Sequence, residues 1–216
     1  MTIDSAIIKT TLCLVILAAS VSTVVCQGRP TRNETLRVVM FNGDMGALLG
    51  HLAQDYRIPI GFELAAKQRG ILVNVDARDV IFPQILDAII KSAPAYQWRE
   101  RDSGIEVLPV AGPSPLLDTI IRNFRVRDID QTEAVNQLLN QPEIQNAMKA
   151  MGLKRRDPGT VPTAKNSGKI SLTLDGLTMR QALNRIAGES GDWYWILRTS
   201  GDGFFSISAS VEYSPV

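Results

Sequence analysis

The sequence has few of the side chains on which most catalytic and metal sites depend. It contains a single histidine, His51, and two cysteines among its 216 residues. Both cysteines, Cys13 and Cys26, lie within the first 26 residues. If that segment is removed, the mature chain has no thiol, no disulfide and no cysteine-based metal site. A cysteine nucleophile is therefore not expected.

The chain also lacks an excess of charge of either sign. Its net charge is +1, from 23 basic and 22 acidic residues. Proteins that bind nucleic acid or anionic membrane surfaces usually carry a basic field, so we predict neither partner. The hydrophobic fraction of 45% and the charged fraction of 21% are typical of a chain that packs a core.

Recognisable catalytic motifs are missing as well. The sequence has no glycine-rich dinucleotide fingerprint, no phosphate-binding loop and no His-Glu-x-x-His pattern. His51 lies four residues from Asp55, on the same face of a predicted helix, without a third member of a site. Carboxylate pairs such as Asp128 with Asp130 fall beside predicted turns, where such residues serve as caps. We therefore predict a protein that is not an enzyme, with no cofactor and no metal.

The one long uncharged run lies near the N-terminus, at residues 10–25. It is short for a membrane-spanning helix and rich in small residues, which indicates a cleavable signal peptide over residues 1–26. Cleavage after Cys26 is preferred to cleavage after Ser20, because a polar stretch begins at Gln27. Secreted eukaryotic proteins of this size usually carry disulfides, whereas the mature chain would have no cysteine. We therefore expect an exported, periplasmic protein. A lipoprotein or a membrane-anchored form is the alternative.

The rest of the chain predicts an α+β fold made of two small sheet-and-helix modules. In residues 34–110 the hydrophobic periodicity gives the order strand, helix, strand, strand, helix, hairpin. Residues 111–115, AGPSP, contain two prolines and a glycine and are interpreted as a linker. A second, diverged module follows over residues 116–210, with an inserted polar loop at 152–168 and a helix that Pro142 divides.

The two modules can be aligned with each other, which indicates a duplication. The strand ILVNVD, from Ile71, matches ISLTLD, from Ile170, and the following helices and hairpins also match. The matched pairs are Gln84 with Gln181, Leu86 with Leu183, Ile89 with Ile186, Tyr96 with Trp193 and Trp98 with Trp195. Weaker matches precede them: Val38 with Phe124, Met40 with Val126, Leu49 with Val135 and Leu52 with Leu138. The strand at Ile58 has no counterpart in this alignment.

This pattern resembles the secretin and TonB short N-terminal domain. MGALLGHLAQDYRIPIGFEL looks like that family's first helix and the strand after it. ILVNVDARDVIFPQILDAIIKSAPAYQWRERDSGIEVLPV looks like its second half, and ISLTLDGLTMRQALNRIAGESGDWYWIL has the same form. The resemblance implies a periplasmic domain without catalytic residues that binds proteins of secretion, transport or signalling machinery. No outer-membrane β-region follows before Val216, so we expect a free-standing double module.

The predicted function is docking on another envelope protein through an exposed strand edge. Residues 58–62 are the candidate edge, because Pro59 and Gly61 suit an edge better than a central strand. The predicted partner-binding residues are Ile58, Pro59, Ile60, Gly61, Phe62, Tyr194 and Phe205. Strand alternation places Trp193 and Trp195 toward the core and Tyr194 on the other face. The alternative is a binder of cell-wall glycan or another small ligand between the modules, through an aromatic face that includes Tyr194 and Phe205.

Overall fold

The computed structural model describes residues 33–65, 68, 70–101, 103–156, 168–200 and 202–208, and two short strands before them. These strands are β1 (Leu14–Val15) and β2 (Val24–Val25), which pair with each other. The cysteines and cleavage points of the predicted signal peptide lie outside the described residues, as do residues 157–167 of the predicted loop. Among the described helices, none is long and apolar enough to cross a membrane.

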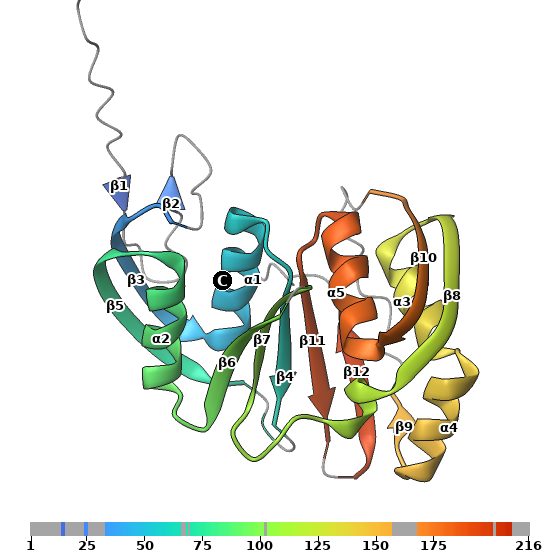
Figure 1. The fold of residues 1–216 in the computed structure, drawn as a ribbon. Helices are drawn as coiled ribbons and strands as arrows, with labels where there is room; N and C mark the ends of the chain where they lie inside the picture. The colour runs from blue at the N-terminus through green and yellow to red at the C-terminus, as the bar shows by residue number, and fades with distance from the viewer. Residues whose placement is uncertain are drawn as a thin grey trace, which may run out of the picture.

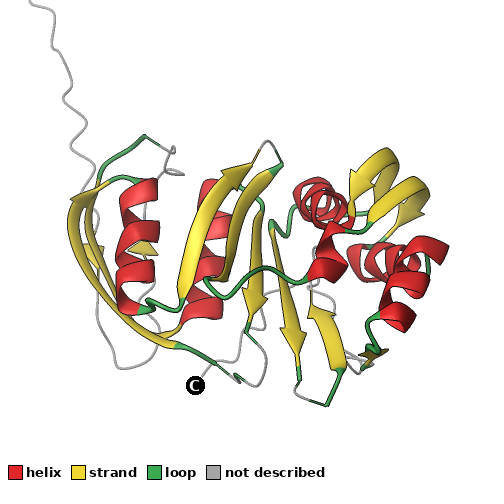
Figure 2. Ribbon diagram, turned by 60° about the horizontal axis from the view of Figure 1, so that its bottom comes forward, coloured by secondary structure: helices red, strands yellow, loops and turns green. Residues whose placement is uncertain are grey.

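The chain has an α+β fold, as the sequence predicts, and Figures 1 and 2 show helices over both ends of a central sheet. The first half contains β3 (Leu36–Asp44), α1 (Met45–Tyr56), β4 (Ile60–Leu64), β5 (Leu72–Val80), α2 (Phe82–Ser92), β6 (Tyr96–Arg101) and β7 (Gly104–Pro109). The second half contains the 3₁₀ helix η1 (Pro115–Asp118), β8 (Ile120–Ile129), α3 (Gln131–Leu139), α4 (Pro142–Ala150), β9 (Lys154–Arg155), β10 (Ile170–Thr178), α5 (Met179–Ser190), β11 (Tyr194–Thr199) and β12 (Phe204–Ser208). The predicted long helix is divided before Pro142, because proline has no N–H for a helical hydrogen bond.

A six-stranded sheet runs through both halves in the order β6-β7-β4-β11-β12-β9. In the first half, β7 pairs antiparallel with β6 and parallel with β4. In the second half, β12 pairs antiparallel with β11 and parallel with β9. The halves meet where β4 pairs parallel with β11, from Ile60 opposite Tyr194 to Leu64 opposite Arg198. The two modules therefore share one sheet across the predicted linker.

The two modules place their cores on opposite faces of this sheet. On β4, Ile60 lies in the first core, which includes side chains of α1 and α2, whereas Gly61 lies against Trp195 of the second core. On β11, Tyr194 lies in the first core and Trp195 in the second. Because neighbouring side chains of a strand point to opposite faces, β4 and β11 are covered on both faces.

Equivalent contacts in the two halves support the predicted duplication. The indole Nε1 of Trp98 donates to Asp87 Oδ1 over 2.8 Å, and that of Trp195 donates to Asn184 Oδ1 over 2.6 Å. The two tryptophans are 97 positions apart, and so are the two acceptors, which lie on α2 and α5. The helical residues that the sequence matches at the same spacing are buried in both halves: Leu86 with Leu183, and Ile89 with Ile186.

The strands before these helices align differently from the sequence-based alignment. Asp79 on β5 and Gly176 on β10 both have left-handed φ values, 52° and 65°, and they too are 97 positions apart. This spacing pairs Ile170 with Val73 rather than with Ile71. The predicted alignment is therefore off by two residues in these strands. A shift of two residues leaves the alternation of inward and outward side chains unchanged, so the sequence pattern does not reveal it.

The second module also contains a counterpart of β4, which the sequence alignment did not find. β9 pairs parallel with β12 just as β4 pairs parallel with β7. It consists of Lys154 and Arg155, whereas β4 has five residues. A strand of two charged residues has no hydrophobic periodicity, which explains its assignment to the loop.

Candidate functional site

The predicted docking strand lies in the centre of the molecule. β4 is flanked by β7 and β11, so the prediction of an edge at residues 58–62 is wrong. Pro59 precedes the strand, where its missing N–H breaks no ladder, and its carbonyl accepts from Ile105 N over 2.8 Å. Gly61 has a packing role, because a Cβ built on it would overlap the indole ring of Trp195. Both residues thus suit this central position, contrary to expectation.

Most of the predicted partner-binding side chains are buried. Ile60, Phe62, Tyr194 and Phe205 are each at most 3% exposed. Tyr194 lies in the first core and Phe205 in the second, so they do not form an exposed aromatic face. Burial raises the pKa of the Tyr194 hydroxyl above its ordinary value. These side chains form the interior of the joined modules and are not available to a partner.

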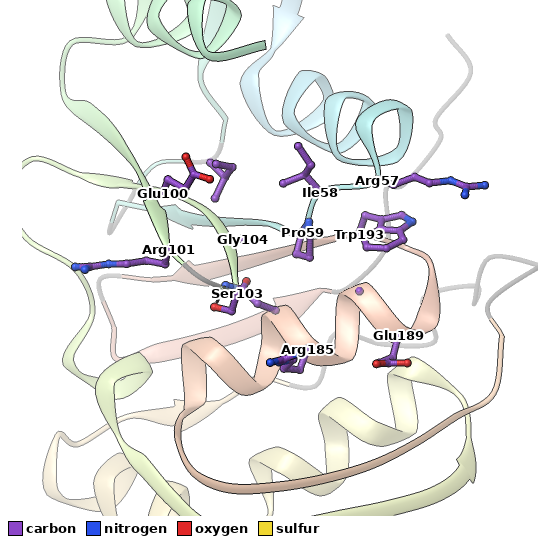
Figure 3. Close-up of a pocket in the computed structure, with 13 residues that line it drawn as sticks. Arg57, Ile58, Pro59, Glu100, Arg101, Ser103, Gly104, Arg185, Glu189 and Trp193 are labelled. Carbon is purple, nitrogen blue, oxygen red and sulfur yellow. Dashed lines mark hydrogen bonds between the residues drawn. The ribbon is translucent and has the colours of Figure 1, made fainter. Parts of the chain in front are cut away.

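The junction of the modules opens into a cavity of about 550 Å³ (Figure 3). Ile58 and Pro59, the two half-buried members of the predicted set, lie on its wall near Trp193. The other lining residues come from the end of α1, the β6–β7 hairpin and α5: Arg57, Glu100, Arg101, Ser103, Gly104, Ile105, Asn184, Arg185, Gly188 and Glu189. Its location agrees with the alternative prediction of a ligand site between the modules.

The polar groups around this cavity do not converge on a common point. Asn184 is fully buried, and its amide is occupied by Trp195 Nε1 on one side and by Ser103 Oγ, 3.1 Å away, on the other. The side chains of Arg57 and Arg101 extend outward in opposite directions (Figure 3). A specific ligand site normally presents a few convergent polar groups, so the cavity is the weaker candidate.

A buried ionic cluster fixes α5 and the linker on the sheet. Arg180 on α5 pairs with Glu63 on β4, and it lies 3.7 Å from Glu106 on β7. The side chains of these three residues are at most 4% exposed. Glu63 also accepts from the backbone N–H of Ser114, over 2.7 Å. Because breaking such a cluster leaves an uncompensated buried charge, it holds the two modules in one arrangement.

The long open edge of the described sheet is β6. No described strand pairs with its outer side. Val110 N donates to Ala95 O over 2.9 Å at the start of the β6–β7 ladder. Alternation along an antiparallel pair then directs the N–H of Arg99 toward β7 and that of Trp98 away from the sheet. β6 therefore presents outward backbone groups to a potential partner strand.

The predicted surface pair of His51 and Asp55 lies on α1. His51 is half-buried and Asp55 is exposed. Partial desolvation raises the pKa of Asp55, and the nearby charge of His51 opposes that shift. In the part of the chain that the structure describes, no three side chains of His, Cys, Asp and Glu are grouped as metal ligands.

No family model, curated protein or solved structure matches the chain. The resemblance to the short N-terminal domain consequently stays a prediction. The features available for a functional inference are the sheet that the two halves share, the outer edge of β6 and the cavity at the junction.

Proposed function

We propose that this protein is an exported, non-catalytic docking protein that accepts a strand of another envelope protein at the open edge of β6. The observation that carries this proposal is the junction within the chain. There β11, the equivalent of β6, accepts β4 of the other module along the stretch from Tyr194 to Arg198. In strand addition, backbone hydrogen bonds supply affinity and the adjacent side chains supply specificity.

Of the two ends of the described sheet, β6 is better suited to this role than β9. β6 has six residues, whereas β9 has only Lys154 and Arg155. Short, positively charged edge strands are a common protection against unwanted pairing. The second module thus ends the sheet, and the first module leaves a full-length edge open.

The predicted signal peptide and the resemblance to the short N-terminal domain support an envelope location. The order of elements in the first half, from β3 to the β6–β7 hairpin, is the order on which that resemblance rests. The partner expected from it is a component of secretion, transport or signalling machinery.

A matched pair of substitutions at Trp98 tests the proposal. Trp98→Pro and Trp98→Ala both remove the indole, but only the proline removes the outward-pointing N–H. We expect the alanine variant to capture the partner from a native envelope fraction and the proline variant to lose that capture. The melting temperatures of the two variants, measured in parallel, verify that both are folded. Equal capture by the two folded variants would contradict docking at β6.

A small ligand in the cavity is the second candidate, favoured by the volume of about 550 Å³ and by the indole of Trp193 on its wall. A cell-wall glycan fragment is the ligand to test first, because sugars stack on aromatic rings. For this function Trp193→Ala should abolish glycan binding in isothermal titration, whereas Trp98→Pro should leave it unchanged. Binding that is insensitive to Trp193→Ala would exclude the cavity.

A further inference from the structure

The junction between the modules contains a specific glycine–tryptophan contact. β4 runs parallel to β11, and Gly61 lies directly opposite Trp195. A Cβ on Gly61 would overlap the Cζ2 and Cε2 atoms of the indole, so the ring occupies the space of a side chain. As a result Trp195 is 1% exposed. A strand that pairs with β11 in this register therefore needs a glycine at this position.

A corresponding environment exists on β6, whose outer side no strand of the described residues covers. Trp98 is the counterpart of Trp195, and each indole donates to a side chain of its own module's helix. The inner side of β6 is taken by β7, as that of β11 is taken by β12. The outer side of β6 thus corresponds to the side of β11 that β4 covers. Trp98 is half-buried, in contrast to Trp195, as expected for the uncovered equivalent.

From this correspondence we infer that the strand accepted at β6 runs parallel to it and carries a glycine opposite Trp98. This inference rests on the proposed function and specifies its partner. The pairing from Tyr194 to Arg198 on β11 transfers, at the spacing of 97 positions, to residues 97–101. The partner segment is therefore about five residues long, as β4 is.

The charges on β6 specify the partner segment further. Arg99 and Arg101 lie on the face opposite to Trp98, because side chains alternate along the strand. Arg101 is exposed, whereas the side chain of Arg99 is 36% exposed and already forms an ion pair with Glu106 Oε2, over 2.5 Å. Oppositely charged residues facing each other across two strands attract. We expect an acidic residue opposite Arg101, three positions after the glycine of the partner.

A short peptide that meets these requirements serves as the probe. IPIGETE keeps Gly61 of this chain and the three residues before it, from Ile58 onward, and places glutamates opposite Arg99 and Arg101. IPIVETE, with valine in place of glycine, is the matched control. Strand propensity alone favours valine over glycine, so a preference for the glycine peptide has the opposite sign to the general trend.

Fluorescence anisotropy of the labelled peptides measures binding, and the NMR shift of the Trp98 indole N–H reports the site. The wild-type protein should bind IPIGETE at least about tenfold more tightly than IPIVETE, a difference of about 1.4 kcal/mol. In Trp98→Ala no indole fills the space where the valine side chain would lie, so this preference should disappear or reverse. If Trp98 only stabilised the fold, Trp98→Ala would weaken the binding of both peptides alike. Loss of the preference for IPIGETE while binding is retained therefore indicates that the indole faces the partner strand.

Three results would overturn the inference. These are equal binding of the two peptides to the wild type, an unchanged preference in Trp98→Ala, and no binding of IPIGETE at millimolar concentration. The proposed function is tested separately, by capture of the partner. If Trp98→Pro abolishes capture and Trp98→Ala retains it, docking at β6 stands even when one of these three results overturns the inference about the glycine. Self-association that light scattering detects and Trp98→Pro abolishes would instead identify a second copy of this chain as the occupant.

Discussion

Replacing Gly61 by alanine tests the junction on which the docking proposal depends. The added methyl group would overlap the ring of Trp195, which is 1% exposed and has no room to retreat without repacking. Overpacking of this kind costs about 1–3 kcal/mol. If the ring moves, its hydrogen bond to the fully buried Asn184 is lost, and an unsatisfied buried acceptor costs a further 1–3 kcal/mol or so. We expect Gly61→Ala to lower the free energy of unfolding by about 2–6 kcal/mol.

Urea unfolding followed by circular dichroism measures this loss as a lower midpoint at an unchanged slope. Gly188→Ala on α5 is the control, because its Cβ would meet Pro59 Cγ at 3.4 Å and Trp193 Cζ3 at 3.5 Å, ordinary contact distances. Alanine in a helix is favoured over glycine by about 1 kcal/mol, so this variant should be at least as stable as the wild type. A Gly61→Ala variant within about 0.5 kcal/mol of the wild type would refute the pairing of β4 with β11 described above.

Three further predictions concern the cluster, the loop before β11 and the core. Arg180→Met leaves Glu63 buried without a cation, whereas Glu106 keeps its ion pair with Arg99, so the free energy of unfolding should fall by about 3–5 kcal/mol in urea titrations; a negligible change would contradict the buried cluster. Burial raises the pKa of Asp192 from 3.8 to about 6, so its stabilising contribution is complete below the unfolded value and is lost as the pH rises through about 6. Asp192→Asn should therefore match the wild type in melting temperature near pH 4 and exceed its stability by about 1–2 kcal/mol above pH 7, after allowance for solvent screening; a gain that is larger at acid pH would have the wrong sign. Leu86→Ala and Leu183→Ala should each cost about 2–5 kcal/mol in chemical denaturation, and a small cost at either site alone would argue against equivalent core positions.

The helices and hairpins of this fold were predictable from local sequence signals. α1 follows from apolar residues at helical spacing behind an acidic cap, and Asp44 does accept from Ala47 N over 3.1 Å. The β6–β7 hairpin follows from two β-rich segments on either side of a turn. These signals depend on neighbouring residues, which is why a single sequence contains them.

The pairing between the modules was not predictable in this way. Pro59 and Gly61 indicate an edge strand when only their own segment is considered, and the reason for the glycine lies in Trp195, far along the chain. Burial of Tyr194 has the same origin, because the face of β11 that an isolated hairpin would expose is covered by the first module. The candidate site moved from β4 to β6 because strand order is set by contacts between distant segments.

Amide hydrogen exchange along β6, resolved by NMR, tests the docking edge most directly. In the free protein the Trp98 amide should exchange rapidly, whereas the Arg99 amide should be protected by its bond to β7. When the captured partner is bound, the Trp98 amide should become protected and the Arg99 amide should change little. A partner that binds without slowing exchange at Trp98 would contradict strand addition at β6.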